Sequence, residues 1–134
     1  LDSFGYDAVL NGAAATVTGP YERSVRDGVE EIDGQWFTKF VVGPIFTDTT
    51  DEDGNVTTAA DNEAAYRTRI DDEAAAGIRY QRDQKLTACD WTILPDSPLS
   101  DDAKTEWQTY RQALRDMPAD SGFPHSVTWP TEPS

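Results

Sequence analysis

A regular pattern of apolar residues near the C-terminus constrains the fold more than any other feature of the sequence. The pattern has spacings of four, three, four and three residues and consists of Ala103, Trp107, Tyr110, Leu114 and Met117. This spacing places the side chains on one face of an α-helix. Ser100 is a suitable N-cap, and Pro118 cannot continue a helix. The pattern therefore predicts a helix from residue 101 to about Asp116 with one buried face.

A second helix is expected over residues 61–88, which are rich in Ala, Glu, Arg and Gln and contain no proline. Asp61 or Asn62 is expected to cap its start. A narrow apolar stripe along it consists of Tyr66, Ile70, Ala74, Ile78 and Leu86. The connection to the next helix is longer than a minimal turn, which favours an antiparallel helical hairpin. Trp91 is expected to pack in the groove between the two helices.

Residues 21–46 are typical of β-strands. The dipeptides Asp27-Gly28 and Asp33-Gly34 interrupt this segment, and each signals a tight turn because glycine readily adopts positive φ. The run at residues 35–42 is rich in aromatic and β-branched residues. Alternation along that run would place on one face Trp36, Thr38 and Phe40. The segment therefore predicts a β-hairpin or a small antiparallel meander.

The expected fold class is α+β, with the β-hairpin or meander followed by the helical hairpin and an extended C-terminal tail containing Pro and Trp. Residues 1–20 are expected to form an extended arm. Residues 21–60 are expected to form a small β subdomain with an acidic loop, and residues 61–134 the helical hairpin and tail. Phe123 and Trp129 are poorly suited to a free tail, so we expect them to pack on the helical hairpin or on a partner.

The charge balance restricts the partners. The chain has 25 acidic and 11 basic residues, which gives a net charge of −14. Nucleic acids and anionic membrane surfaces attract basic proteins, so neither is an expected partner. The charge is consistent with two interpretations, a surface that keeps the protein soluble and a surface that meets a basic partner. There is no apolar run of about 18–20 residues, so no membrane span is expected. No signal peptide is expected at the start.

Catalytic and metal-binding patterns are scarce. One cysteine, Cys89, and one histidine, His125, leave few possibilities for a nucleophile–base pair or a zinc site. The run Asp51-x-Asp53-Gly54 suggests a calcium loop, but with Gly54 at position six the first and twelfth positions are Thr49 and Ala60, which are not suitable ligands. An acidic turn is expected instead. Acidic residues are abundant, so a glycosidase-type pair stays open as a minor alternative. We expect no enzyme activity, no cofactor and no metal.

The sequence from Arg79 onward contains several short motifs. In order along the chain they are Arg82-Asp83-x-x-Leu86, Asp90-Trp91-Thr92, Asp96-Ser97-Pro98-Leu99, Trp107-x-x-Tyr110-Arg111-Gln112-Ala113-Leu114-Arg115-Asp116-Met117-Pro118, Gly122-Phe123-Pro124 and Val127-Thr128-Trp129-Pro130. This string of motifs resembles the phage tail assembly chaperone family, also called tail fibre assembly-like proteins. The blocks at residues 27–36 and 41–44 resemble related proteins of marine cyanophages. Residues 1–20 are not covered by either resemblance.

The resemblance implies a non-enzymatic tail fibre assembly chaperone or accessory protein that binds a tail fibre or baseplate protein. The alternative is a permanent structural component of the virion tail, such as a fibre-attached or baseplate adaptor protein. The expected location is the virion tail, the host cytoplasm during assembly, or both, and a homo-oligomer stays open. Candidate partner-binding residues are Trp36, Phe40, Arg111, Arg115, Phe123 and Trp129. For Arg111 and Arg115, pairing inside the chain with Asp90 or Asp96 is an open alternative.

Overall fold

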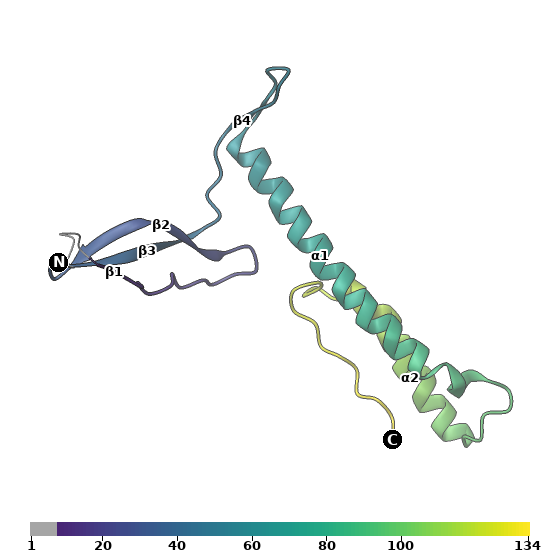
Figure 1. Ribbon diagram of the computed structural model, residues 1–134. Coiled ribbons are helices and arrows are strands. Elements are labelled where there is room, and N and C mark those ends of the chain that lie inside the picture. The colour runs from purple at the N-terminus through teal and green to yellow at the C-terminus, as the bar shows by residue number, and fades with distance from the viewer. Residues whose placement is uncertain (1–7) are drawn as a thin grey trace. The chain divides into compact units, whose positions relative to one another are not determined.

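The computed structural model describes residues 8–134 and places a small sheet before two helices (Figure 1), which confirms the α+β class. The chain forms two compact units, of which the first ends at Arg67 and the second is Thr68–Ser134. The elements are β1 (Val9–Leu10), β2 (Arg23–Ile32), β3 (Gln35–Gly43), β4 (Thr49–Thr50), β5 (Val56–Thr57), α1 (Ala59–Ala88), the 3₁₀ turn η1 (Asp90–Ile93), α2 (Asp101–Asp116) and η2 (Met117–Ala119).

β2 and β3 form the expected antiparallel hairpin. Ile32 pairs with Gln35, so the two residues between them make the turn. Asp33 has a φ of 52° and Gly34 a φ of 79°. Positive φ at both positions matches the right-handed twist of the strands, and Asp-Gly tolerates this conformation well. The turn predicted at Asp33-Gly34 is confirmed.

The second turn predicted from an Asp-Gly dipeptide is absent, because Asp27-Gly28 lies inside β2. The pairing register shifts between Arg26 and Val29, so two residues of β2 lie opposite one residue of β3. Gly28 has a φ of 77°, and the Asp27 carboxylate forms an ion pair with Lys39 at 3.7 Å. This bulge places a glycine at positive φ, as the hairpin turn does, which explains why the same dipeptide fits both. The segment is therefore a hairpin and not a meander.

The third strand of this sheet comes from the N-terminal region. The strand order is β1-β3-β2, and β1 runs parallel to β3, with Val9 opposite Trp36 and Leu10 opposite Phe37. The segment after β1 is held by two hydrogen bonds from backbone N–H groups to side-chain hydroxyls. The N–H of Gly12 donates to Thr38 Oγ1 at 2.8 Å, and the N–H of Ala15 donates to the Ser24 hydroxyl at 2.9 Å. Residues 1–7 of the expected arm lie outside the described residues.

The acidic loop is the turn of a two-stranded ribbon formed by β4 and β5. The Asp51 carboxylate accepts hydrogen bonds from the Asn55 side-chain amide and from the backbone N–H groups of Asn55 and Asp53, at 2.8–3.0 Å. These hydrogen bonds lower the pKa of Asp51, and the hydrogen bond from the Asn55 side chain has the largest effect. The expected acidic turn is confirmed. Across residues 8–134 there is no group of three or more His, Cys, Asp or Glu side chains suited to hold a metal ion.

α1 begins two residues earlier than expected, so the predicted caps Asp61 and Asn62 are wrong. Thr58 precedes the helix, and its hydroxyl accepts from the N–H of Asp61 at 3.2 Å and donates to the Asp61 carboxylate at 2.8 Å. The Asp48 carboxylate accepts from the N–H of Ala59 at 2.8 Å. These groups accept hydrogen bonds from two N–H donors of the first turn. Asp61 therefore lies in the first turn, where it is favourable to the helix dipole.

The apolar stripe of α1 is partly buried along its length, as predicted. Tyr66 contacts the ring of Phe46 in the first unit, with 5.4 Å between the ring centroids. Ala75 is buried in the second unit. Within the described part of the chain, no helix has the length and apolar character that a membrane crossing requires.

α2 spans Asp101–Asp116, as the apolar pattern predicts, and Ser100 caps it by accepting from the N–H of Ala103 at 3.2 Å. Replacing Ser100 with alanine should lower the free energy of unfolding by about 1 kcal/mol, because this N–H loses its acceptor. Urea unfolding followed by circular dichroism at 222 nm measures the loss. Ser100→Asp retains an acceptor and should keep most of the stability. An equal loss in both variants would contradict the role of the cap.

Candidate functional site

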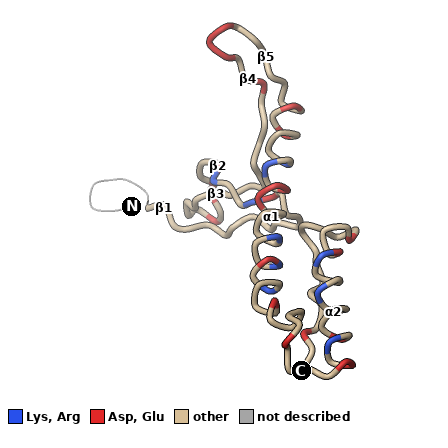
Figure 2. The backbone as a smooth tube through the Cα atoms, turned by 90° about the vertical axis from the view of Figure 1, so that its right-hand side faces the viewer, with Lys and Arg blue, Asp and Glu red and all other residues tan. Residues whose placement is uncertain are grey.

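The buried face of α2 forms the core of the second unit. Trp107, Tyr110 and Leu114 are 7%, 5% and 0% exposed, and Met117 is 2% exposed, so the predicted apolar face is confirmed. The core cluster also contains Cys89, and three partly buried residues pack against it: Leu86, Leu99 and Trp129. Figures 1 and 2 show α1 and α2 side by side and running in opposite directions. This helical pair is the framework on which the other features of the unit rest.

Arg111 lies inside this framework and is 5% exposed. Its guanidinium donates to the Leu86 carbonyl at 2.8 Å, to the Asp90 carboxylate at 2.9 Å and to Cys89 Sγ at 3.1 Å. Burial lowers the pKa of Arg111. The hydrogen bonds and charges of Cys89 and Asp90 raise this pKa by a larger amount, so the net shift is upward. Arg111 therefore joins the end of α1 to α2 and forms the internal pair with Asp90 that the sequence left open.

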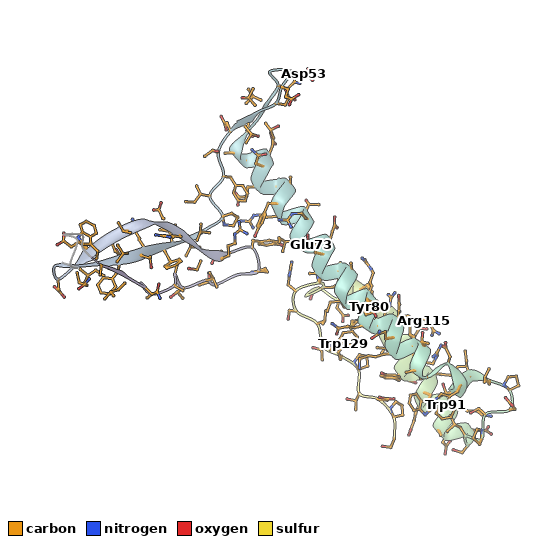
Figure 3. The ribbon with its side chains drawn as sticks, viewed as in Figure 1. Asp53, Glu73, Tyr80, Trp91, Arg115 and Trp129 are labelled. Atoms are coloured by element: carbon orange, nitrogen blue, oxygen red, sulfur yellow. The ribbon has the colours of Figure 1, made fainter. Side chains whose placement is uncertain are left out.

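Arg115 lies one turn further along α2 and is exposed in the last turn of the helix. Figure 3 labels it on the helical pair. A cation in the last turn is favourable to the helix dipole, and here its head group is also accessible to a partner. The two arginines proposed from the sequence thus differ: Arg111 is engaged inside the unit, and Arg115 is on its surface.

The C-terminal tail contacts α1 through aromatic rings and cations. The Arg79 guanidinium lies 5.2 Å from the ring centroid of Phe123, and the Lys85 ammonium lies 5.4 Å from that of Trp129. His125 forms a short hydrogen bond with Asp71 of the same helix. Residues 127–134 have no regular secondary structure. Phe123 and Trp129 therefore have partners within the unit, and both keep part of their surface exposed.

A hollow of about 490 Å³ lies between α2 and the end of the tail and is lined by Thr105, Glu106, Thr109, Tyr110, Ala113, Pro130, Thr131, Glu132, Pro133 and Ser134. Burial, followed by the negative charge of Glu132, raises the pKa of Tyr110 above its ordinary value. The lining contains the carboxylates of Glu106 and Glu132 and no cysteine or histidine.

Trp36 and Phe40 lie on β3 in the first unit. Both are half-buried, and they pair with Glu31 and Arg26 of β2. Their positions differ by four residues along a strand, so they share one face of the sheet with Thr38. The proposed partner-binding residues therefore divide between the units, with Trp36 and Phe40 in the first and the other four in the second.

Three of the exposed large apolar residues are neighbours in the sequence, and none of them was expected to bind a partner. Trp91, Ile93 and Leu94 are 44%, 54% and 52% exposed on and beside η1. The prediction that Trp91 packs between the helices is wrong: its ring meets the edge of Trp107, with 6.0 Å between the centroids, and nearly half of it faces solvent. Thr92 points inward instead and is 3% exposed.

A comparison with known protein families found a match for the C-terminal part of the chain. Residues 75–134 match the family model described as phage tail assembly chaperone protein. This range contains η1, α2, the tail and the part of α1 that packs against them. A search of curated proteins and a search of solved structures each found no match.

Proposed function

We propose, from the match of residues 75–134 to the phage tail assembly chaperone family, that the protein is a non-enzymatic assembly factor that binds a tail fibre protein. The observation that carries the proposal is that the matched range coincides with one folded structure. The range ends the chain and includes the whole of α2, its capped start and its buried face. The matched range therefore contains the residues that stabilise the helical pair.

The physical properties of the chain suit an assembly factor. Fibre proteins are rich in strand edges and apolar surface, which are prone to incorrect association before assembly is complete. A small protein with a net charge of −14 can cover such a surface and repel further copies of itself. In the first unit, β2 pairs only with β3 among the described residues, so its outer edge is open to strand addition on either side of the bulge.

The proposed contacts use side chains that keep exposed surface. In the first unit these are Trp36 and Phe40, and in the second they are Arg115, Phe123 and Trp129. We assign Arg111 to the support of the helical pair, because all the hydrogen bonds found for its guanidinium are made inside the chain. Lys85 and Arg79 hold the two tail rings in place, which reduces the entropy lost when they bind.

A second candidate function is a permanent adaptor in the virion tail. The observation that favours it is the first unit, which ends at Arg67 and therefore lies outside the family match. A separate unit with its own sheet gives the protein a second surface, as a connector between two tail proteins requires. Under this alternative the protein stays in the particle after assembly.

Quantitative mass spectrometry of purified particles tests the two functions. An assembly factor should be absent from particles or far below the copy number of the fibre protein, and deletion of its gene should leave fibre protein aggregated in infected cells. A fixed copy number relative to the fibre would instead support the adaptor. If the protein were absent from particles and its deletion left the fibres unchanged, both functions would be excluded.

A further inference from the structure

The loop between α1 and α2 carries an exposed apolar surface formed by Trp91, Ile93 and Leu94, which we call the apolar knuckle. About half of each side chain faces solvent. Single exposed apolar residues are common on protein surfaces, but three within four consecutive residues of one short turn form a patch. Figure 3 labels Trp91 at the end of the helical pair, away from Tyr80 on α1.

The apolar knuckle is held in place from inside the unit. The buried Thr92 hydroxyl donates to the Cys89 carbonyl at 2.7 Å, and the N–H of Thr92 donates to the same carbonyl at 3.1 Å. Arg111 holds Asp90, the residue before Trp91, and the Trp91 ring rests on the edge of Trp107. A surface that is already ordered loses little conformational entropy on binding, and a tryptophan in such a position is a frequent source of binding energy.

The surroundings of the apolar knuckle are acidic. Residues 89–103 contain four aspartates and no lysine or arginine. All four aspartates are exposed: Asp90, Asp96, Asp101 and Asp102. Figure 2 marks acidic positions on this loop and at the start of α2. Asp90 is paired with Arg111 at 2.9 Å. The nearest cations in the sequence are Lys85 and Lys104, and Lys85 lies against the ring of Trp129.

We propose that the apolar knuckle is the docking site for a protein partner whose contact surface is an apolar groove rimmed by Lys or Arg. A second copy of this chain does not fit this role, because it would bring four further aspartates against the first four. An anionic membrane surface is disfavoured by the same charges. The inference rests on the proposed function, since it assigns the surface by which this family module holds a tail protein.

A designed peptide probes this chemistry without knowledge of the natural partner. The probe is an 18-residue amphipathic helix of leucine and lysine, and its charge control has glutamate in place of lysine. Fluorescence anisotropy of the labelled peptides measures the dissociation constant with the full chain. The test variant is the double substitution Trp91→Ser and Ile93→Ser. The matched control is Tyr80→Ser, which removes a ring that is 65% exposed on α1.

Both variants keep the net charge, so they keep the long-range attraction for a basic peptide and differ only in the apolar contact. The double variant should bind the lysine peptide at least tenfold more weakly than the unchanged chain, Tyr80→Ser should bind it equally well, and the glutamate peptide should not bind. Circular dichroism checks that each variant is folded. Equal binding by the double variant, or binding of the glutamate peptide, would overturn the proposal.

Sedimentation velocity tests whether a second copy of this chain, and not a basic partner, occupies the apolar knuckle. If the unchanged chain forms dimers that the double variant does not form, a second copy occupies the apolar knuckle and the proposal is wrong. The peptide result is also independent of the particle experiment. A chain with no effect on fibre assembly that still binds the lysine peptide through the apolar knuckle would retain the docking site and lose the tail fibre as its target.

Discussion

Replacing Trp107 with alanine should lower the free energy of unfolding of the helical unit by about 3–5 kcal/mol, the usual cost of removing a large buried aromatic side chain. Trp107 is 7% exposed and belongs to the cluster with Cys89, Tyr110 and Leu114. Its ring contacts that of Tyr110 edge to face, with 5.7 Å between the centroids. A unit of this size has only a small reserve of stability, so the variant should be partly unfolded at 25 °C.

The matched control is Trp91→Ala, because this ring touches Trp107 but is 44% exposed. Its loss removes one aromatic contact and a side chain that is only about half buried, so the expected change is smaller, about 1–2 kcal/mol. Urea unfolding at 222 nm measures both variants, since α2 and most of α1 lie in this unit. Equal losses in the two variants would show that the core does not depend on Trp107 as the burial indicates.

This pair of tryptophans also separates stability from binding. Trp107 should be required for folding, whereas Trp91 should be required mainly for the contact of the apolar knuckle with its partner. The sequence led us to expect both residues to be buried, Trp107 on the apolar face of its helix and Trp91 in the groove between the two helices. The difference arises from the neighbouring Thr92, whose hydroxyl finds a carbonyl acceptor inside the unit and so turns the flanking side chains outward.

The helices were the most predictable part of the fold because their signals are local. The apolar spacing, the Ser100 cap and Pro118 together predicted α2 with its observed bounds. The start of α1 was less predictable, because Thr58, Asp61 and Asn62 are all good capping residues. The helix begins after Thr58 in part because the Asp48 carboxylate accepts a hydrogen bond from the N–H of Ala59. Asp48 and Ala59 are 11 residues apart in the sequence.

The sheet shows why the β-region was only partly predictable. Asp27-Gly28 and Asp33-Gly34 are the same dipeptide, yet one is a bulge and the other a hairpin turn. Both need a residue with positive φ, so local conformation does not distinguish them. The pairing of Val25 with Val41 and of Val29 with Thr38 decides the outcome, and such pairings join residues far apart in the sequence. The parallel pairing of β1 is non-local for the same reason.

The burial of Arg111 could have been read from the helical spacing. Arg111 follows Trp107 by four residues and precedes Leu114 by three, so it lies on the buried face. Arg115 follows Tyr110 by five residues, which turns it away from that face. Because the two arginines are one turn apart, the same role was expected for both. The structure separates them into a buried side chain that holds the apolar knuckle and an exposed one.

Replacing Arg111 with methionine should therefore cost far more than the same change at Arg115. Methionine keeps much of the volume but removes the guanidinium donor from the Leu86 carbonyl, which keeps only the Cys89 donors, and it releases Asp90, so we expect a loss of about 2–4 kcal/mol in the free energy of unfolding. Arg115→Met removes an exposed charge and should change stability by about 0.5 kcal/mol or less.

Arg111→Lys distinguishes charge from geometry at this position. Lysine keeps the positive charge but cannot reach the Leu86 carbonyl and the Asp90 carboxylate with two arms of a planar group, so it should recover only part of the lost stability. Urea unfolding compares the three variants, and the lysine peptide then tests the released loop. Because Asp90 precedes Trp91, Arg111→Met should also weaken peptide binding under conditions where the variant remains folded. Full stability in Arg111→Lys would mean that charge alone holds the loop, and unchanged binding in Arg111→Met would mean that the apolar knuckle does not depend on Arg111 for its position.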